Sequence, residues 1–156
     1  MPLPPFQYAL DQHRDALARF LAATVGPGEA EDCLQETLIA ALRAYPRLRD
    51  GSNVRAWLFT IARNKALDEH RARVRRPLPV AEADSGGSVA VALGDESDAE
   101  LWASVRALPP KQRAAVVLRF VNDFSHREVA AVLDCSEEAA RRSLHEGLTR
   151  LRREMQ

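Results

Sequence analysis

Apolar residues recur at steps of three and four along most of this chain, and this spacing restricts the fold more than any other feature. Residues at such steps lie on one face of an α-helix, and no stretch alternates as a half-buried β-strand would. The spacing stops at Pro77 and Pro79, which precede a run rich in Gly, Ser, Ala and Asp. We therefore predict an all-α fold of two small helical domains, residues 1–79 and 101–156, joined by a flexible acidic linker over residues 80–100.

Three helices are predicted before the linker. The first carries apolar residues from Phe6 to Phe20 and is expected to end before the breaker Gly26-Pro27-Gly28. The second follows this breaker, with carboxylates in its first turn, where they favour the helix dipole. Its inner stripe is predicted to be Leu34, Leu38, Ala41, Leu42 and Tyr45. Ser52 or Asn53 is expected to cap the third helix. The apolar face of that helix is predicted to be Val54, Trp57, Leu58 and Ile61.

Further helices are predicted after the linker, and the last two have the spacing of a helix-turn-helix. Pro110 can open one helix, Ser125 can cap a short one, and Ser136 can cap a longer one. Ala130 lets the last two helices approach closely, which would present the second of them to a DNA major groove. A plain helical hairpin is the alternative interpretation of these residues.

The formal net charge of the chain is +0, but its charges are segregated. Residues 1–79 hold 12 basic and 9 acidic side chains, residues 80–100 hold none and 6, and residues 101–156 hold 10 and 7. Local fields, rather than the total charge, govern association with phosphates. Two mildly basic ends are therefore compatible with nucleic-acid binding.

Several classes of protein are excluded by what the sequence lacks. No apolar run approaches the roughly 20 residues that a bilayer span requires, so we expect no membrane insertion. The start of the chain lacks a secretory signal, and we expect a cytoplasmic location. Cys33 and Cys135 are expected to be free thiols, and the four histidines have no metal-ligand spacing. Without a GxSxG, Walker or HExxH pattern, we expect neither an enzyme nor a bound cofactor or metal.

Stretches at 31–37 (EDCLQET), 55–64 (RAWLFTIARN), 107–113 (ALPPKQR) and 117–120 (VLRF), followed by the helix-turn-helix, form a distinctive order. This order resembles the extracytoplasmic-function sigma factors of the sigma-70 family, and the likeness covers nearly the whole chain outside the linker. The resemblance implies an N-terminal region 2 and a C-terminal region 4 that direct RNA polymerase to the minus-ten and minus-thirty-five promoter elements. It also implies that the chain itself has no catalytic activity.

The resemblance assigns roles to particular residues. It implies that Asp32, Gln35 and Glu36, which share one helix face, contact the β′ clamp helices of core polymerase. For minus-ten DNA it implies contacts by Arg47, Ser52, Asn53, Arg63, Asn64, Lys65 and Arg71. For minus-thirty-five DNA it implies contacts by Ser136, Arg141, Arg142 and His145. Other implied partners are the polymerase β flap and an anti-sigma factor that clamps the two domains together.

Asn64 and Trp57, both in the third helix, are expected to have different roles. The amide of Asn64 offers a donor and an acceptor to an unstacked base, together with the loop over residues 47–53. Trp57 lies on the apolar stripe, which favours a core position over base stacking.

The stretch from Arg63 to Arg76 carries six basic and two acidic residues, which suits phosphate binding. The alternative interpretation is a solvated helix end.

The expected recognition helix departs from the family pattern. Ala139 and Ala140 replace a common Thr-Val pair, Ser143 and Glu146 stand where a basic residue is common, and Gly147 stands in the helix interior. These changes reduce apolar bulk and positive charge. Three functions therefore remain open: a promoter-recognising sigma factor, a helix-turn-helix regulator independent of polymerase, and a sigma-like interaction protein that no longer reads promoters.

Overall fold

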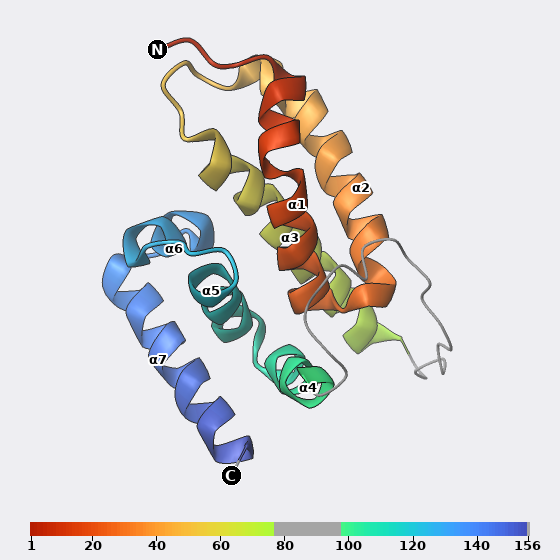
Figure 1. Cartoon of the computed structure of the whole chain (residues 1–156), viewed down its shortest axis with the longest axis vertical. Coiled ribbons are helices and arrows are strands. Elements are labelled where there is room, and N and C mark those ends of the chain that lie inside the picture. The colour runs from red at the N-terminus through yellow and green to blue at the C-terminus, as the bar shows by residue number, and fades with distance from the viewer. Residues whose placement is uncertain (77–97, 156) are drawn as a thin grey trace.

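The computed structural model describes residues 1–76 and 98–155, and in this part the chain is helical, without a strand (Figure 1). The first range contains α1 (Phe6–Val25), α2 (Pro27–Ala44), the short 3-10 helix η1 (Tyr45–Arg47) and α3 (Val54–Arg75). The second contains α4 (Ala99–Ala107), α5 (Pro110–Phe120), α6 (His126–Leu133) and α7 (Glu137–Glu154). The all-α prediction is thus confirmed. Most of the predicted linker lies outside the described residues, and α4 already begins before its predicted end.

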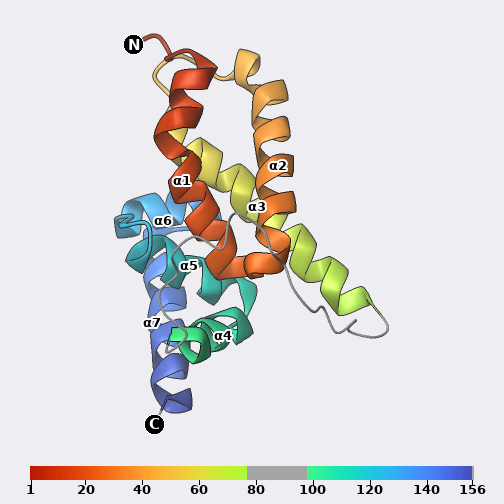
Figure 2. The same ribbon diagram turned by 45° about the vertical axis from the view of Figure 1, so that its right-hand side comes forward.

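Helices α1 and α2 lie side by side, and α3 crosses them obliquely (Figure 2). The chain reverses at Gly26, whose backbone φ of 92° is rarely adopted by residues that have a Cβ. Its N–H donates to the carbonyl oxygen of Ala22 at 3.1 Å, and Pro27 then begins α2 with a φ already suited to a helix. The breaker is therefore shorter than predicted, because two of its three residues form the first turn of α2.

The start of α3 is fixed by one of the two predicted caps. The side-chain oxygen of Asn53 accepts a hydrogen bond from the N–H of Ala56 at 3.1 Å, while Ser52 makes no such bond. This bond satisfies one of the donors that a helix leaves free at its N-terminus.

Two core predictions in this part of the chain are wrong. Leu42, expected on the inner stripe of α2, has 58% of its surface exposed. Phe59, absent from the predicted apolar face of α3, is fully buried between Phe20 of α1 and Phe124 of the connection between α5 and α6. The periodicity of α3 suggested a single inner face, whereas the helix is covered on a second side by α5 and α6.

The helix-turn-helix prediction is confirmed by the geometry of α6 and α7. The hydroxyl of Ser125 accepts from the N–H of Glu128, whose carboxylate accepts from the N–H of Ser125, which completes a capping box. Asp134 ends α6 in the left-handed region with a φ of 54°, and the hydroxyl of Ser136 caps α7. These caps fix where α6 begins and ends and where α7 begins.

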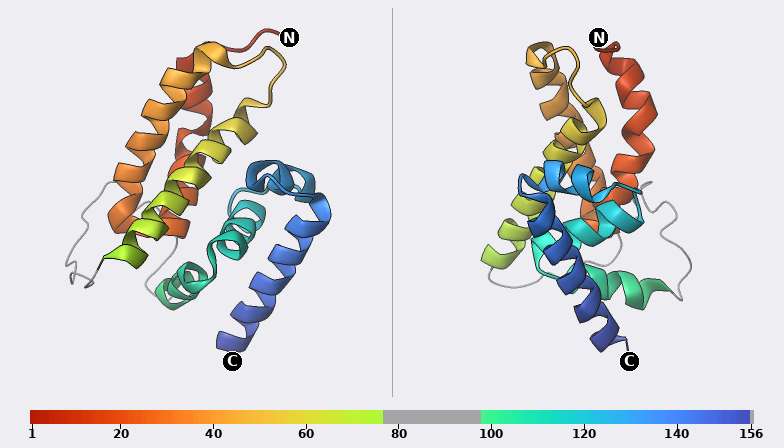
Figure 3. Two further views of the ribbon diagram at one scale, coloured as in Figure 1. Left: turned by 180° about the vertical axis from the view of Figure 1, so that it is seen from behind. Right: turned by 90° about the vertical axis from the view of Figure 1, so that its left-hand side faces the viewer.

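The part before residue 77 and the part after residue 97, here called the N-terminal half and the C-terminal half, pack against each other (Figure 3). Helix α3 contacts α6, and α1 contacts α4 and α5. Side chains from both halves join one buried cluster, in which the ring of Phe59 lies 4.8 Å from that of Phe124. Both halves therefore share a core in this structure.

Candidate polymerase and nucleic-acid surfaces

One exposed stripe of α2 combines charged and apolar side chains. Asp32, Gln35 and Glu36 are all exposed, and none takes part in a hydrogen bond or ion pair with another described residue. Ile39 and Leu42 continue the stripe with 50% and 58% of their surfaces exposed. These five residues are here called the α2 outer face, and among the described elements α2 packs against α1, α3 and η1 rather than against the C-terminal helices.

Exposed apolar side chains beside unpaired charges are typical of a protein interface. The sequence indicated the three polar residues of the α2 outer face but not the two apolar ones. Their spacing from Gln35, by four and then three residues, was the available signal, since it places all of them on one helical stripe.

The residues predicted to contact minus-ten DNA lie in two places, in the segment before α3 and along α3 itself. Arg47 is exposed in η1, and Ser52 and Asn53 follow in the loop before α3, where the side-chain oxygen of Asn53 is already engaged in capping. Asn64 is exposed on α3, about 15 Å along the helix from Val54 at 1.5 Å per residue.

A helical spacing of seven and eleven residues relates Asn64 to Trp57 and Asn53, which places the three on one stripe of α3. Trp57 is half-buried, and its ring lies 5.9 Å from that of Tyr45, which agrees with its predicted packing role. The residues expected to capture a base therefore do not form one compact pocket. Asn64 lies about three turns of helix away from the loop before α3.

The positive charge at the end of α3 is partly neutralised by a carboxylate of the same helix. Glu69 lies 3.5 Å from Arg73 and 3.7 Å from Arg76, so that one carboxylate serves two cations. Arg71 is exposed and makes no ion pair with another described residue, and Lys65 is half-buried. Arg63 instead lines a small cavity between α1, α3 and α5. The predicted cations therefore differ in their surroundings: Arg63 and Arg73 line spaces between the halves, whereas Arg71 is exposed.

Helix α7 leaves its outward side open. Arg141, Arg142 and His145 are exposed, and Arg141 pairs with Glu137 one turn earlier at 2.9 Å. Ser136 lies at the N-cap, where its hydroxyl accepts from the N–H of Ala139. The four predicted residues thus lie along the free N-terminal half of this helix.

The structure gives a packing reason for two departures in α7. Ser143 is buried, so the absence of a basic side chain there removes no outward contact. Gly147 is also buried, and a Cβ at this position would lie 2.9 Å from Val116 and 3.4 Å from Gln112. The glycine lets α5 and α7 approach closely, which offsets the roughly 1 kcal/mol that glycine costs within a helix.

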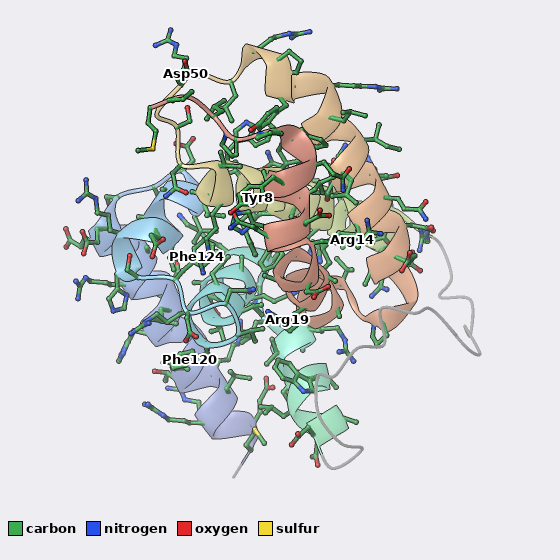
Figure 4. All side chains as sticks on the ribbon, turned by 45° about the horizontal axis from the view of Figure 1, so that its top comes forward. Tyr8, Arg14, Arg19, Asp50, Phe120 and Phe124 are labelled. Carbon is green, nitrogen blue, oxygen red and sulfur yellow. The ribbon has the colours of Figure 1, made fainter. Side chains whose placement is uncertain are left out.

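Arg55 is the centre of the contact between the halves. It donates from Nη2 to the carbonyl oxygen of Asn122 at 2.6 Å and pairs with Glu128 at 3.2 Å. Its guanidinium carbon lies 3.9 Å from the centre of the Phe124 ring, and Figure 4 places Phe124 beside the N-terminal helices. A hydrogen bond, an ion pair and a cation–π contact thus converge on one side chain.

Other polar bonds cross the same boundary. Asn122 donates from Nδ2 to the carbonyl oxygen of Ala16 at 3.1 Å, and Arg113 donates from Nη1 to that of Thr24 at 2.9 Å. The pKa of Glu128 is held below its ordinary value, first by the backbone N–H of Ser125 and also by the nearby Arg55. Sequence reasoning missed these contacts, because only the fold brings residues so distant in the chain together.

An apolar groove of about 210 Å³ lies on the C-terminal half. Its lining residues are Leu101, Trp102, Val105, Val116, Val117, Phe120, Val121, Leu148 and Leu151. Phe120 is 60% exposed at this groove and, unlike Phe124, is not enclosed by the N-terminal helices (Figure 4). This surface was also missing from the sequence predictions.

The remaining sequence predictions concern thiols, metals and membranes. Cys33 and Cys135 are free thiols, as predicted, and burial followed by nearby carboxylates raises the pKa of Cys33 to about 12. Within residues 1–76 and 98–155, no three His, Cys, Asp or Glu side chains are grouped to hold a metal ion. Among the helices of these residues, none has the length and apolarity needed to cross a bilayer.

Both halves of the chain match models of the same protein family. Residues 9–76 match the family model described as Sigma-70 region 2, and residues 98–151 match that described as Sigma-70, region 4. The ECF RNA polymerase sigma factor SigD of Mycobacterium tuberculosis is 33% identical, over 94% of this chain and 74% of its own length. The RNA polymerase sigma factor CarQ of Myxococcus xanthus is 34% identical, over 94% and 87%.

A solved structure has the same arrangement of helices. The sigma factor RpoE of Bartonella quintana, crystallised in complex with the anti-sigma factor NepR, superposes with a TM-score of 0.73 and 26% sequence identity. The likeness covers 95% of this chain and 94% of that one, so it includes helices of both halves.

Proposed function

The chain belongs to the extracytoplasmic-function sigma factors of the sigma-70 family, and on this premise we propose which of its surfaces serves each step of transcription initiation. Its function is to bind core RNA polymerase and direct it to promoters. Polymerase supplies the chemistry of RNA synthesis, so the sigma factor itself is proposed to catalyse no reaction, and it is proposed to act in the cytoplasm. The observation that carries the assignment of surfaces is the α2 outer face, which is exposed, unpaired and free of the C-terminal half.

The α2 outer face is proposed to bind the β′ clamp helices of core polymerase. Asp32, Gln35 and Glu36 offer acceptors to donors on a partner helix, while Ile39 and Leu42 supply apolar surface that becomes buried. Arranged in this way, charged residues fix the register of the contact and apolar residues contribute affinity.

The apolar groove beside Phe120 is proposed to receive the β flap of polymerase. It is lined by apolar side chains of α4, α5 and α7, and its position is set by the same helices that present the recognition helix. One polymerase subunit could then hold α7 over DNA while the other holds α2.

The open stripe of α3 is proposed to hold minus-ten DNA. Asn64 would pair with the edge of an unstacked base, the loop residues Arg47, Ser52 and Asn53 would border its path, and Lys65 and Arg71 would hold phosphates. Arg63 would join them only after the halves separate, because it lines the cavity between them.

The packed halves are proposed to be a stored form that opens on polymerase. As their names state, the two promoter elements lie about 25 base pairs apart, or roughly 85 Å along B-form DNA. A packed chain of 156 residues is only about 40 Å across by the usual scaling of size with length. Residues 77–97 have a maximum reach of about 70 Å by length alone, which permits the separation.

An anti-sigma factor is proposed as a further partner of this stored form. The solved relative RpoE was crystallised with such a factor, and the present chain has the same helices in both halves. A protein that binds both halves at once would stabilise the packed form by mass action and keep α3 and α7 too close together for a promoter.

Run-off transcription on a promoter pool with purified core polymerase tests the proposal. Wild-type protein is expected to give promoter-specific transcripts, whereas Asp32→Lys with Glu36→Lys should lose core binding in a pull-down while keeping its helical content. Asp15→Lys, an exposed charge reversal on α1, is the control and should bind core normally. Undiminished binding by the double variant would move the polymerase contact away from the α2 outer face.

A further inference from the structure

A cavity of about 450 Å³ lies between the halves, separate from the α2 outer face and from the apolar groove beside Phe120. Its walls come from the end of α1, the last turns of α3 and the junction of α4 with α5. Three guanidinium groups line it from three different helices: Arg73 from α3, Arg106 from α4 and Arg113 from α5. Glu69 is the carboxylate among the lining residues, so the cavity carries more positive than negative charge.

Arg113 is buried without a carboxylate partner among the described residues. Only 8% of its surface is exposed, and its two terminal nitrogens donate to the carbonyl oxygens of Thr24 and Leu108, each at 2.9 Å. Its Nε is buried and has no hydrogen-bond partner among the described residues. Burial, followed by the nearby Arg73 and Arg106, lowers the pKa of Arg113. A buried cation in this state lacks the counter-charge that usually offsets its desolvation.

Arg106 is also uncompensated. It makes no hydrogen bond or ion pair with another described residue, and burial followed by Arg73 lowers its pKa. The carboxylate of Glu69 is already shared by Arg73 and Arg76, which leaves no acidic group of the lining for Arg106 and Arg113.

We propose that this cavity binds a small, multiply charged phosphate anion, such as pyrophosphate, and that the anion links the two halves. The planar guanidinium groups of Arg106 and Arg113 suit phosphate oxygens, and α5 begins at Pro110 in the same wall, where the helix dipole favours an anion. The volume lies within the range of small-molecule sites. Because both halves supply ligands, the bound anion stabilises the packed form over the separated one.

The chain's own acidic residues are the other source of negative charge. Glu82, Asp84, Asp95 and Glu96 belong to residues 77–97, outside the described part of the chain. A variant in which these four become the corresponding amides distinguishes the two sources, since it removes the competing carboxylates and leaves every lining arginine in place.

Isothermal titration calorimetry of the full chain with pyrophosphate, in chloride buffer at constant ionic strength, is the direct test. We expect about one site per chain, with binding weakened at least about tenfold in Arg106→Gln, the scale of one lost charge-assisted hydrogen bond. Arg75→Gln is the matched control, because Arg75 is an exposed arginine of the same last turn of α3 as Arg73 and does not line the cavity. It should change the affinity less than about twofold.

Urea unfolding of the same proteins separates binding from folding. Without pyrophosphate, Arg106→Gln should unfold at the wild-type midpoint or above it, because it loses no described bond and relieves repulsion from Arg73. With pyrophosphate, only wild type, Arg75→Gln and the four-amide variant should shift upwards. Equal shifts with sodium chloride, equal losses in Arg75→Gln and Arg106→Gln, or binding confined to the four-amide variant would each overturn the proposal.

Discussion

Helices α3 and α7 are both proposed to meet promoter DNA, but they are packed differently. Helix α3 packs against α1 and α2 on one side and against α5 and α6 on another, whereas the described helices that pack most against α7 are α4, α5 and α6 of its own half. Separation of the halves would therefore uncover a face of α3, including Arg55 and Phe59, but would leave the surroundings of α7 unchanged.

The two helices also differ in charge. The last three turns of α3 carry four basic side chains (Lys65, Arg71, Arg73 and Arg75) against Asp68 and Glu69, while the first half of α7 alternates Glu137 and Glu138 with Arg141 and Arg142. Phosphate contacts supply affinity without sequence preference, and base contacts supply specificity. We therefore infer that α3 contributes mainly phosphate contacts, part of which, at Arg63, depends on separation of the halves, and that α7 contributes weaker reading of bases in either arrangement.

The largest expected effect comes from removing the cover of α3. Phe124→Ala should lower the free energy of unfolding by about 3–5 kcal/mol, because a fully buried ring between Phe59 and Arg55 is replaced by a cavity. Urea unfolding followed by circular dichroism measures this loss.

The control for this prediction is Phe120→Ala. Phe120 is 60% exposed at the apolar groove, so the same truncation should cost less than about 1 kcal/mol. If the two variants lost equal stability, Phe124 would not be a core residue shared by the halves, and α3 would lack the proposed second cover.

The difference between Phe124 and Phe120 also marks how far the sequence could predict the fold. Local signals were sufficient for the caps at Ser125 and Ser136 and for the helix-turn-helix, because these involve residues three or four apart. The burial of Phe59 was not predictable from the apolar spacing of α3, because its partners Phe20 and Phe124 lie about forty and more than sixty residues away in the sequence and only the fold brings them together.

The candidate sites follow the same division. The spacing of Gln35, Ile39 and Leu42 was readable as a stripe, but whether its apolar members are core or surface depends on which side of α2 meets α1. Arg55 begins the motif at residues 55–64, but the sequence predicted no contact for it, because its partners Asn122 and Glu128 belong to the other half.

A second prediction concerns the side of α3 that stays open in both arrangements. Asn64→Ala should reduce promoter opening by roughly tenfold to a hundredfold, the scale of one lost base contact, while binding to core polymerase is retained. Permanganate footprinting of unpaired thymines measures the opening. Asp68→Ala, an exposed change one turn later, is the control, and normal opening by the Asn64 variant would move base capture elsewhere.

The third prediction tests base reading by α7. Arg141→Ala should cost roughly 1–3 kcal/mol at one promoter position if Arg141 contacts a base, measured by binding of the polymerase holoenzyme to single-base promoter variants. Glu137→Ala should have the opposite sign, because it releases Arg141 from its 2.9 Å ion pair. Uniform weakening across all promoter sequences, with a shallower salt dependence, would instead make Arg141 a phosphate contact.

The smallest expected effect is a loss of stability in mild acid, which acts through the packed side of α3. The pKa of His13 is lowered by burial and then by Arg55, and that of His70 by burial and then by Arg113, Arg73 and Arg71. Both histidines therefore take up a proton less readily in the folded chain than in the unfolded one, whose histidines titrate near 6.5. Stability is then full above pH 6.5 and falls as the pH drops through this value towards the lowered pKa values.

This window is distinct from that of Glu128, whose pKa is lowered from 4.5, so its contribution is lost only at more acidic pH. Unfolding midpoints between pH 7.5 and 5.5 would be compared for wild type, His13→Gln with His70→Gln, and His145→Gln as the exposed control on α7. The double variant should lose most of the slope and the control should keep it. A slope that disappears in His145→Gln would place the sensitive group on α7, and the acid sensitivity would then belong to the proposed recognition helix and not to the packing around α3.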